Sequence, residues 1–150
     1  MTKTKEKIED GGYYALKGFA FQFNKSLLEV LENQESDVEI EQIQDIGVDN
    51  YYIQVKYHET QTYANWKIKK PMVQLLEYSK SDKSRNFCLY CYFNDKSPER
   101  VTLTEDDLDQ ILGTVIVKKC HFDIVNVKLI MVTVKNSSMT FSKNRMLKSF

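Results

Sequence analysis

Two short β-rich segments separated by a turn signal constrain the fold of this chain more than any other feature. Val38 to Ile43 alternates apolar and polar residues, as a half-buried strand does, and Asp45 to Val48 either continues that strand or forms a second one. Asp49-Asn50 is a turn signal, and Tyr51 to Tyr57 follows as a run of β-favouring residues. The sequence therefore predicts a β-hairpin that turns at Asp49-Asn50.

Helical periodicity is found on both sides of this hairpin. Apolar residues at spacings of three and four predict a helix over residues 14–33 with one apolar face. This face consists of Leu16, Phe19, Ala20, Phe23, Leu27, Val30 and Leu31. After the hairpin, Met72, Leu75 and Leu76 predict a second helix with a buried stripe, and Pro71 suits its first turn, where the missing N–H is not needed.

The second half of the chain completes the predicted fold class. Phe87 to Phe93 is a strand candidate, and Val115 to Val117 and Ile124 to Val134 are also strand-like. Between them, Thr104 is the expected N-cap of a helix that ends before Gly113. Helices before and after a hairpin imply an α/β protein with a mixed central sheet flanked by helices, plus a C-terminal helix and one or two extra strands.

The length of 150 residues and the 42% of hydrophobic residues suit one domain with one core. We expect a single domain over residues 14–134 with its core in 14–93, an N-terminal lead over 1–13, and a polar tail or linker over 135–150. The polar end of the chain is typical of a domain that belongs to a longer protein, although a complete short protein is the open alternative.

The cysteines and the lack of long apolar runs bear on the compartment. No apolar run approaches the roughly 18 residues of a membrane span, and the first residues lack the apolar stretch of a signal peptide. Cys88 and Cys91 are three apart in a predicted strand, so they point to opposite faces and cannot share a metal or a disulfide. We expect core cysteines, a reducing cytoplasmic location and no association with a membrane.

The charge is balanced overall but uneven along the chain. The 21 basic and 21 acidic side chains exclude a strongly basic nucleic-acid binder. Residues 1–50 carry 5 basic and 11 acidic side chains, whereas residues 51–85 carry 7 basic and 3 acidic ones. This pattern can place a metal-binding pocket beside a phosphate-binding surface, or it can be ordinary scatter over solvated faces.

Four polar residues of the predicted hairpin form a candidate site. Glu41 and Asp45 share a face if their strand is unbroken, and Gln54 and Lys56 share a face of the next strand. A carboxylate such as Asp45 can hold Mg²⁺, Gln54 offers a neutral oxygen, and Lys56 can position a water or offset developing charge. This combination suits phosphodiester cleavage. The alternative is a surface salt bridge of Lys56 with a carboxylate beside a solvated Gln54.

These residues resemble those of a known nuclease superfamily. Gly18-Phe-Ala-Phe-Gln22, then Glu41 and Asp45, then Ile53-Gln-Val-Lys-Tyr57 resemble the PD-(D/E)XK nucleases, in the variant where glutamine replaces the second acid. The predicted order of helix, three strands, helix and strand over 14–93 is similar to the restriction-endonuclease-like core of that superfamily. The stretch is most similar to the double-stranded DNA endonuclease domains at the N-termini of bacterial antiphage effectors of the CBASS, AVAST and Lamassu systems.

The resemblance implies a role for each matching residue. Asp45 corresponds to the metal-binding aspartate, Gln54 to the replaced acid and Lys56 to the catalytic lysine. Gln22 corresponds to a glutamine that reaches the site from the first helix, and Glu41 to an auxiliary acid. The implied metal ligands are Asp45, Gln54 and Glu41, and the implied cofactor is Mg²⁺ or Mn²⁺.

The function expected on this basis is metal-dependent hydrolysis of double-stranded DNA with low sequence specificity, by an antiphage effector that is activated by association. The expected partners are DNA and either further copies of the chain or a sensor or ATPase region of a defence complex. The expected phosphate contacts are Lys67, Lys69, Lys70, Lys80, Lys83 and Arg85. Alternatively, these residues form an ordinary solvated helix face.

Three other interpretations remain open at this point. The first is a catalytically inactive DNA-binding module of the same fold, which the neutral Gln54 and the zero net charge favour. The second is an RNA-cutting member of the superfamily. The third is an unrelated α/β scaffold, which predicts that Gln22, Asp45, Gln54 and Lys56 do not cluster. His58 shares the strand face of Lys56, where a supporting or solvated role is more common than that of a base.

Overall fold

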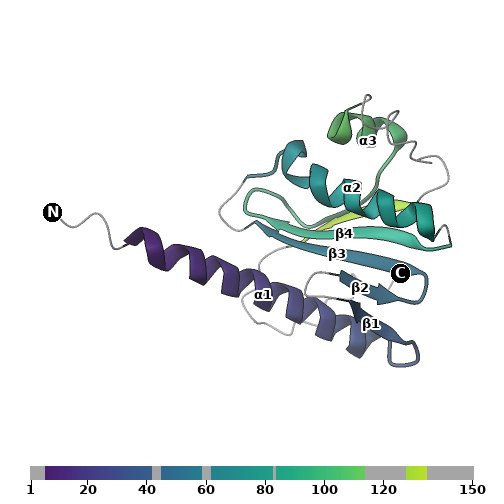
Figure 1. Ribbon diagram of the computed structural model, residues 1–150, viewed down its shortest axis with the longest axis horizontal. Coiled ribbons are helices and arrows are strands. Elements are labelled where there is room, and N and C mark those ends of the chain that lie inside the picture. The colour runs from purple at the N-terminus through teal and green to yellow at the C-terminus, as the bar shows by residue number, and fades with distance from the viewer. Residues whose placement is uncertain (1–5, 42–44, 59–61, 83, 114–127, 135–150) are drawn as a thin grey trace.

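A six-stranded mixed sheet forms the centre of the structure, a computed structural model that describes residues 6–41, 45–58, 62–82, 84–113 and 128–134 (Figure 1). Only the backbone is described for residues 6–10 and 41. The elements in chain order are α1 (Glu6–Glu32), β1 (Val38–Glu41), β2 (Asp45–Val48), β3 (Tyr51–His58), α2 (Asn65–Ser81), β4 (Asn86–Phe93), β5 (Glu99–Thr102), α3 (Glu105–Leu112) and β6 (Leu129–Thr133).

The strands lie in the order β1-β2-β3-β4-β6-β5. The first three form an antiparallel meander, β3, β4 and β6 are parallel, and β5 joins β6 antiparallel at the edge. The prediction of a mixed α/β sheet flanked by helices is therefore confirmed, and β6 lies within the predicted strand-like segment Ile124 to Val134, whereas the sequence did not predict β5. Of the predicted strand-like segments, Val115 to Val117 and residues 124–127 lie outside the described residues.

The predicted hairpin is present, and its turn lies where the sequence placed it. Residues Asp45 to Val48 form a strand of their own, the second of the two alternatives, which pairs with both β1 and β3. Asp49 in the β2–β3 turn has a φ of 46°, a left-handed conformation that Asp tolerates better than most residues.

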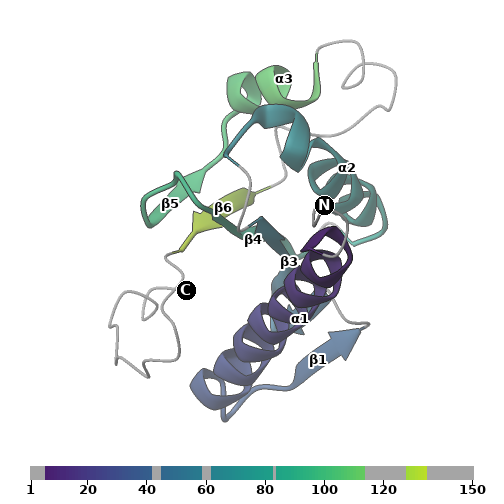
Figure 2. The ribbon, with the colours of Figure 1, turned by 90° about the vertical axis from the view of Figure 1, so that its left-hand side faces the viewer.

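Helices cover both faces of the sheet (Figure 2). On one face, α2 and α3 pack against alternate residues of β4 and β6, such as Phe87, Leu89 and Leu129. On the other face, residues such as Ile53, Val55 and Tyr90 form a second apolar cluster, against which Phe21 of α1 packs. We call these the α2 face and the α1 face. The strand alternation that separates them decides where each polar side chain of the hairpin points.

The helix α2 begins earlier than its sequence pattern indicated. It starts at Asn65, so Pro71 lies inside the helix and the prediction of Pro71 in the first turn is wrong. The physical reason is packing: Ile68 is fully buried and extends the stripe of Met72, Leu75 and Leu76 by one turn. This burial offsets the backbone hydrogen bond that an internal proline removes.

Two local predictions are confirmed. Thr104 and Asp107 form a capping box at the start of α3, and Gly113 follows the helix with a φ of 85°. Cys88 and Cys91 are both buried, and they belong to the clusters of the two opposite faces.

The first helix differs most from expectation. It begins at Glu6 instead of residue 14, and its predicted apolar face does not pack against the sheet: Leu16 and Phe23, for example, are 67% and 58% exposed. None of the helices in the described part of the chain is long and apolar enough to cross a membrane.

Candidate active site

The pairing of β2 with β3 brings together three of the predicted site residues. Asp45 lies directly opposite Gln54 in the register of the two strands, so both side chains leave the same face of the sheet. Lys56 follows Gln54 by two residues and therefore shares this face. The register partner of Asp45 on its other side is Glu41, whose side chain lies outside the described residues.

This face is the one that α2 covers. The Gln54 side chain is buried, and its Nε2 donates a hydrogen bond of 2.8 Å to Oε1 of Gln74 on α2. That bond orients the amide of Gln54 and directs its carbonyl oxygen away from Gln74. Sequence analysis missed Gln74 because a glutamine within a helix carries no signal of its own; only the tertiary contact identifies it.

Two buried oxygens of the site have no hydrogen-bond donor within the described part of the chain. Neither Asp45 Oδ1 nor Gln54 Oε1 has a hydrogen-bond partner among the described residues. A buried acceptor without a partner costs about 1–3 kcal/mol, so such atoms are rare outside sites that bind something. Oxygen atoms of this kind are the ligands that Mg²⁺ and Mn²⁺ prefer, and one or two carboxylates are enough when phosphate and water complete the coordination.

The charges of the site perturb each other in a partly dehydrated environment. Burial raises the pKa of the Asp45 carboxyl, and the Tyr52 hydroxyl and the Lys56 ammonium oppose this only in part. Burial also lowers the pKa of Lys56, while Asp45 opposes the change and Lys70 on α2 adds to it. Two groups of opposite charge that burial shifts toward neutrality are typical of functional sites, although structural ion pairs show the same behaviour.

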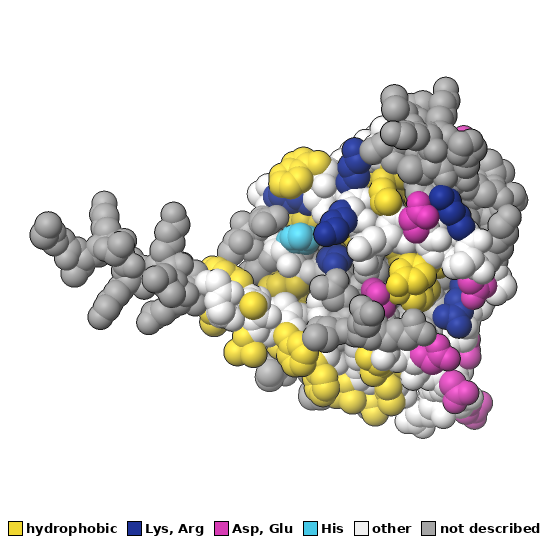
Figure 3. All heavy atoms as spheres, viewed as in Figure 1, with side chains coloured by type: hydrophobic (Ala, Val, Ile, Leu, Met, Phe, Trp, Pro, Cys, Tyr) yellow, Lys and Arg dark blue, Asp and Glu magenta, His cyan; other side chains and the backbone are white. Residues whose placement is uncertain are grey.

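The predicted phosphate contacts divide into two groups along α2. Lys67, Lys69 and Lys70 lie in its first two turns, and Lys70 is close enough to affect Lys56. Figure 3 shows Lys and Arg side chains gathered around the histidine on this side of the molecule. Next to them, Trp66 is 72% exposed, and Lys67 Nζ lies 5.5 Å from the centroid of its ring.

The second group lies at the other end of α2 and has acidic partners. Lys80 pairs with Glu77 at 3.2 Å and Arg85 pairs with Asp82 at 3.1 Å. Arg85 also lines a surface hollow together with several acidic residues, namely Glu35, Asp37, Glu39 and Asp49. These acids make this end of α2 the weaker candidate for phosphate binding. Lys83 lies outside the described residues.

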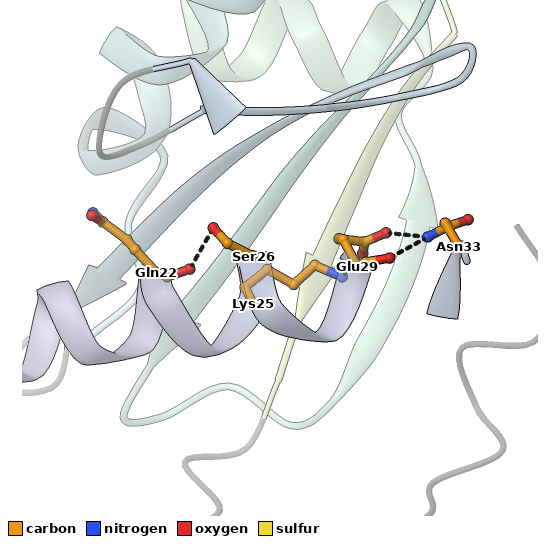
Figure 4. Close-up of polar contacts among 5 residues, drawn as sticks. All are labelled: Gln22, Lys25, Ser26, Glu29 and Asn33. Carbon is orange, nitrogen blue, oxygen red and sulfur yellow. Dashed lines mark hydrogen bonds and ion pairs between the residues drawn. The ribbon is translucent and has the colours of Figure 1, made fainter. Parts of the chain in front are cut away.

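The remaining predicted member, Gln22, comes from the α1 face. Its buried Oε1 has no hydrogen-bond partner in the described part of the chain, and its main-chain oxygen accepts a bond of 3.0 Å from the Ser26 hydroxyl (Figure 4). In Figure 4, Gln22 lies at one end of the row of labelled side chains and Asn33 at the other, with Lys25 and Glu29 between them. The structure thus assembles Asp45, Gln54 and Lys56 on the α2 face and places Gln22 on the helix that covers the other face.

His58 is held by packing. Its ring stacks on Phe93 with centroids 4.7 Å apart, and Tyr63 meets Phe93 edge-on at 5.2 Å. Phe93 belongs to the core under α2, so His58 shares the face of Lys56, as predicted. This stacking favours a supporting role for His58.

No group of three or more His, Cys, Asp or Glu side chains that could hold a metal ion occurs within the described ranges. Any metal here would rely on one carboxylate, on amide oxygens and on ligands from substrate and water. Comparisons of the chain with protein-family models, with curated proteins and with solved structures gave no match.

Proposed function

We propose that this chain is a metal-dependent endonuclease domain that hydrolyses double-stranded DNA with little sequence specificity. The observation that carries the proposal is the register of β2 and β3, which sets Asp45 opposite Gln54 with Lys56 on the same face. The resemblance to the PD-(D/E)XK superfamily with its restriction-endonuclease-like core supports the same chemistry, because three of its five motif residues, Asp45, Gln54 and Lys56, share one face of the sheet.

Asp45 and Gln54 would supply oxygens to hold Mg²⁺ or Mn²⁺. The two atoms available for this are Asp45 Oδ1 and Gln54 Oε1, both buried and without a hydrogen-bond donor among the described residues. The metal, when bound, polarises the phosphate and lowers the pKa of a coordinated water. Gln74 keeps the Gln54 amide in the orientation that presents its oxygen. Glu41, the register partner of Asp45, is the further ligand candidate from the resemblance, whereas Gln22 lies on α1, which covers the opposite face of the sheet.

Lys56 acts on the reacting groups from the same strand. Its ammonium can orient the attacking water and offset the negative charge that develops on the phosphate. The lowered pKa of Lys56, which results mainly from burial, increases the fraction that can accept a proton from that water. Its position two residues from Gln54 on a central strand holds it rigidly relative to the metal ligands.

DNA would approach over the first turns of α2. Lys67, Lys69 and Lys70 lie there, Lys70 close enough to Lys56 to affect its pKa, and the first turn of the helix carries no acidic residue. Lysines of this kind contact phosphates without reading bases, which fits low specificity and a strong dependence on salt. The resemblance to antiphage effectors adds the proposal that association of copies, or of a sensor or ATPase region, activates the enzyme in the cytoplasm.

Plasmid cleavage tests this function. The full chain, alone and fused to an inducible dimeriser, is incubated with supercoiled plasmid in Mg²⁺, in Mn²⁺ or in EDTA. We expect nicking or linearisation that requires the metal, and a loss of at least about 10²-fold in Lys56→Ala and in Asp45→Asn. Lys80→Ala is the matched control, because this lysine lies on α2 but pairs with Glu77 away from the site.

Three outcomes would contradict the proposal in different ways. DNA binding without cleavage in the dimerised form, unaffected by Lys56→Ala, would indicate an inactive binding module. Preferential cleavage of structured RNA over duplex DNA would indicate an RNA-cutting enzyme. Neither binding nor cleavage of either nucleic acid would leave an α/β scaffold as the simplest description.

A further inference from the structure

The helix α1 buries a charged pair against the sheet and exposes many of its large apolar side chains, the reverse of the usual arrangement of a surface helix. Lys25 and Glu29 of α1 are only 3% and 4% exposed, form an ion pair with each other, and face the sheet (Figure 4). Lys25 Nζ also lies 4.5 Å from the ring centroid of Tyr90, and Asn33 donates a bond of 3.0 Å to Glu29. The charged pair of this part of the helix is therefore inside, and apart from Phe21, which packs on the sheet, most of its large apolar side chains are outside.

The outward-facing apolar residues form a continuous stripe. We call this stripe the α1 seam; its seven large side chains are between 40% and 67% exposed. They are Tyr13, Leu16, Phe19, Phe23, Leu27, Val30 and Leu31. In Figure 3 hydrophobic side chains line the lower edge of the molecule, along which α1 runs in Figure 1. A contiguous apolar patch of this size on a surface marks an interaction site.

The spacing of the seam indicates a helical partner. Leu16, Phe23 and Val30 of the seam repeat every seven residues. Leu27 lies between Phe23 and Val30, and Ala20, a small residue that is not counted in the seam, lies seven residues before Leu27. This is the heptad spacing of helices that pack side by side, where each side chain enters a space between residues of the facing helix. A helix that packed on a strand edge or a loop would need no such regular repeat.

The absence of charge on the seam excludes several kinds of partner. Between Tyr13 and Leu31 the only charged residue besides the buried Lys25 and Glu29 is Lys17. An acidic or basic partner would find nothing to pair with. A helix that lies on an anionic membrane presents Lys and Arg on a polar face, but here the polar face of α1 is occupied by the sheet. The partner that matches an uncharged heptad stripe is another uncharged heptad stripe.

The exposed area is sufficient for a stable pair. If a fully exposed large apolar side chain has about 200 Å², the seven residues together expose roughly 700 Å². A standard protein interface buries about 800 Å² on each partner, and stable ones begin near 600 Å². The seam alone therefore approaches what a dimer needs, and neighbouring side chains such as Tyr14, which is 38% exposed, add to it.

We propose that two copies of this chain form a dimer by packing their α1 seams against each other. The same surface on both copies satisfies the requirement of a twofold interface that each patch be complementary to itself. This inference rests on the burial and spacing of α1 residues alone, so it is independent of the proposed nuclease activity.

Sedimentation equilibrium of the full chain over a range of concentrations tests the dimer. We expect a dimer in the micromolar range, and a weakening of at least about thirtyfold in Phe23→Glu, which places a charge in the middle of the seam. Ala15→Glu adds the same charge to an exposed position of the same helix outside the heptad repeat, and we expect it to leave the dimer intact. Because Phe23 is exposed in the single chain, the melting temperature of the dissociated variant should equal that of dilute wild type.

Each other result overturns the inference. A dimer that survives Phe23→Glu would have a different interface. A monomer at all concentrations whose melting temperature falls in Phe23→Glu would mean that the chain itself covers the seam. A monomer that co-sediments with anionic phospholipid vesicles, and loses this in Phe23→Glu, would assign the seam to a membrane surface. A monomer that does none of these would leave the seam without a partner.

Discussion

The helices α1 and α2 cover opposite faces of the sheet, and they turn opposite kinds of side chain toward it. On α2, Leu75 and Leu76 are fully buried and Lys70 is exposed. On α1, Lys25 and Glu29 are buried, whereas residues of equal hydrophobicity to those of α2 are exposed. Both helices show regular apolar spacing in the sequence. The difference teaches that such spacing identifies a face that packs against something, but not what it packs against.

The faces also differ in how they treat buried charge. Under α1, Lys25 and Glu29 neutralise each other, and Asn33 supplies a further hydrogen bond to the carboxylate. Under α2, Asp45 Oδ1 has no donor within the described residues, and burial raises the pKa of this carboxyl. We therefore expect the charge pair under α1 to serve the structure and the charge under α2 to serve the site, at some expense of stability.

The largest effect is expected from breaking the charge pair under α1. Glu29→Leu leaves the Lys25 ammonium buried without its carboxylate, which costs about 3–5 kcal/mol of unfolding free energy. Urea denaturation followed by circular dichroism measures this loss.

The double variant Lys25→Met/Glu29→Leu is the control for this prediction. A buried ion pair that is replaced as a whole by apolar residues is often neutral or stabilising, so we expect the double variant to recover most of the loss. A single variant within about 1 kcal/mol of wild type would contradict the burial of the pair, because it would mean that water reaches Lys25.

A smaller effect, with a matched control, is expected from shortening one leucine in each helix. Leu75→Ala on α2 removes a side chain that is 0% exposed and should cost about 2–5 kcal/mol. Leu27→Ala on α1 removes one that is 40% exposed, so the monomer should lose less than about 1 kcal/mol. Both are measured by urea denaturation at submicromolar protein. Equal losses would break the comparison of the two helices, since Leu27 would then be part of the core.

The sequence was sufficient to predict the features of the structure that depend on residues close together along the chain. Asp49 and the β-rich runs beside it specify the hairpin, and the period of two in the strands puts Asp45, Gln54 and Lys56 on one face once the turn is known. The cap of α3 is equally local, because Thr104 and Asp107 satisfy each other. These features need no knowledge of the rest of the molecule.

What could not be predicted depends on tertiary contacts. The start of α2 at Asn65 is set by the burial of Ile68 under the sheet, which outweighs the unfavourable position of Pro71. The contact of Gln74 with Gln54 joins two elements that no local pattern relates. The prediction of which face of α1 meets the sheet was wrong for the same reason. The spacing of residues alone does not show that the Lys25–Glu29 pair, and not the apolar stripe, faces the sheet.

The smallest change in unfolding free energy is expected from Asp45→Asn under α2. This substitution should stabilise the protein, whereas Glu29→Leu should destabilise it. Because the pKa of Asp45 is raised in the folded protein, the folded state favours the protonated form. Its contribution to stability is present at low pH and is lost as the pH rises through the folded pKa. Asp45→Asn removes that cost, so we expect the variant to be more stable than wild type at pH 7, by less than about 1 kcal/mol because the group is partly solvated.

The gain should disappear below about pH 4, where the carboxyl is protonated in both states, and this pH dependence is what urea titrations at pH 7 and pH 3.5 would detect. Asp107 provides the opposite case: the Thr104 backbone and hydroxyl lower its pKa, so Asp107→Asn should bring no gain at pH 7. A loss of stability in Asp45→Asn at neutral pH would mean that this carboxylate holds the hairpin together. The two faces of the sheet would then use their buried charges in the same way, and the case for Asp45 as a metal ligand would lose its energetic support.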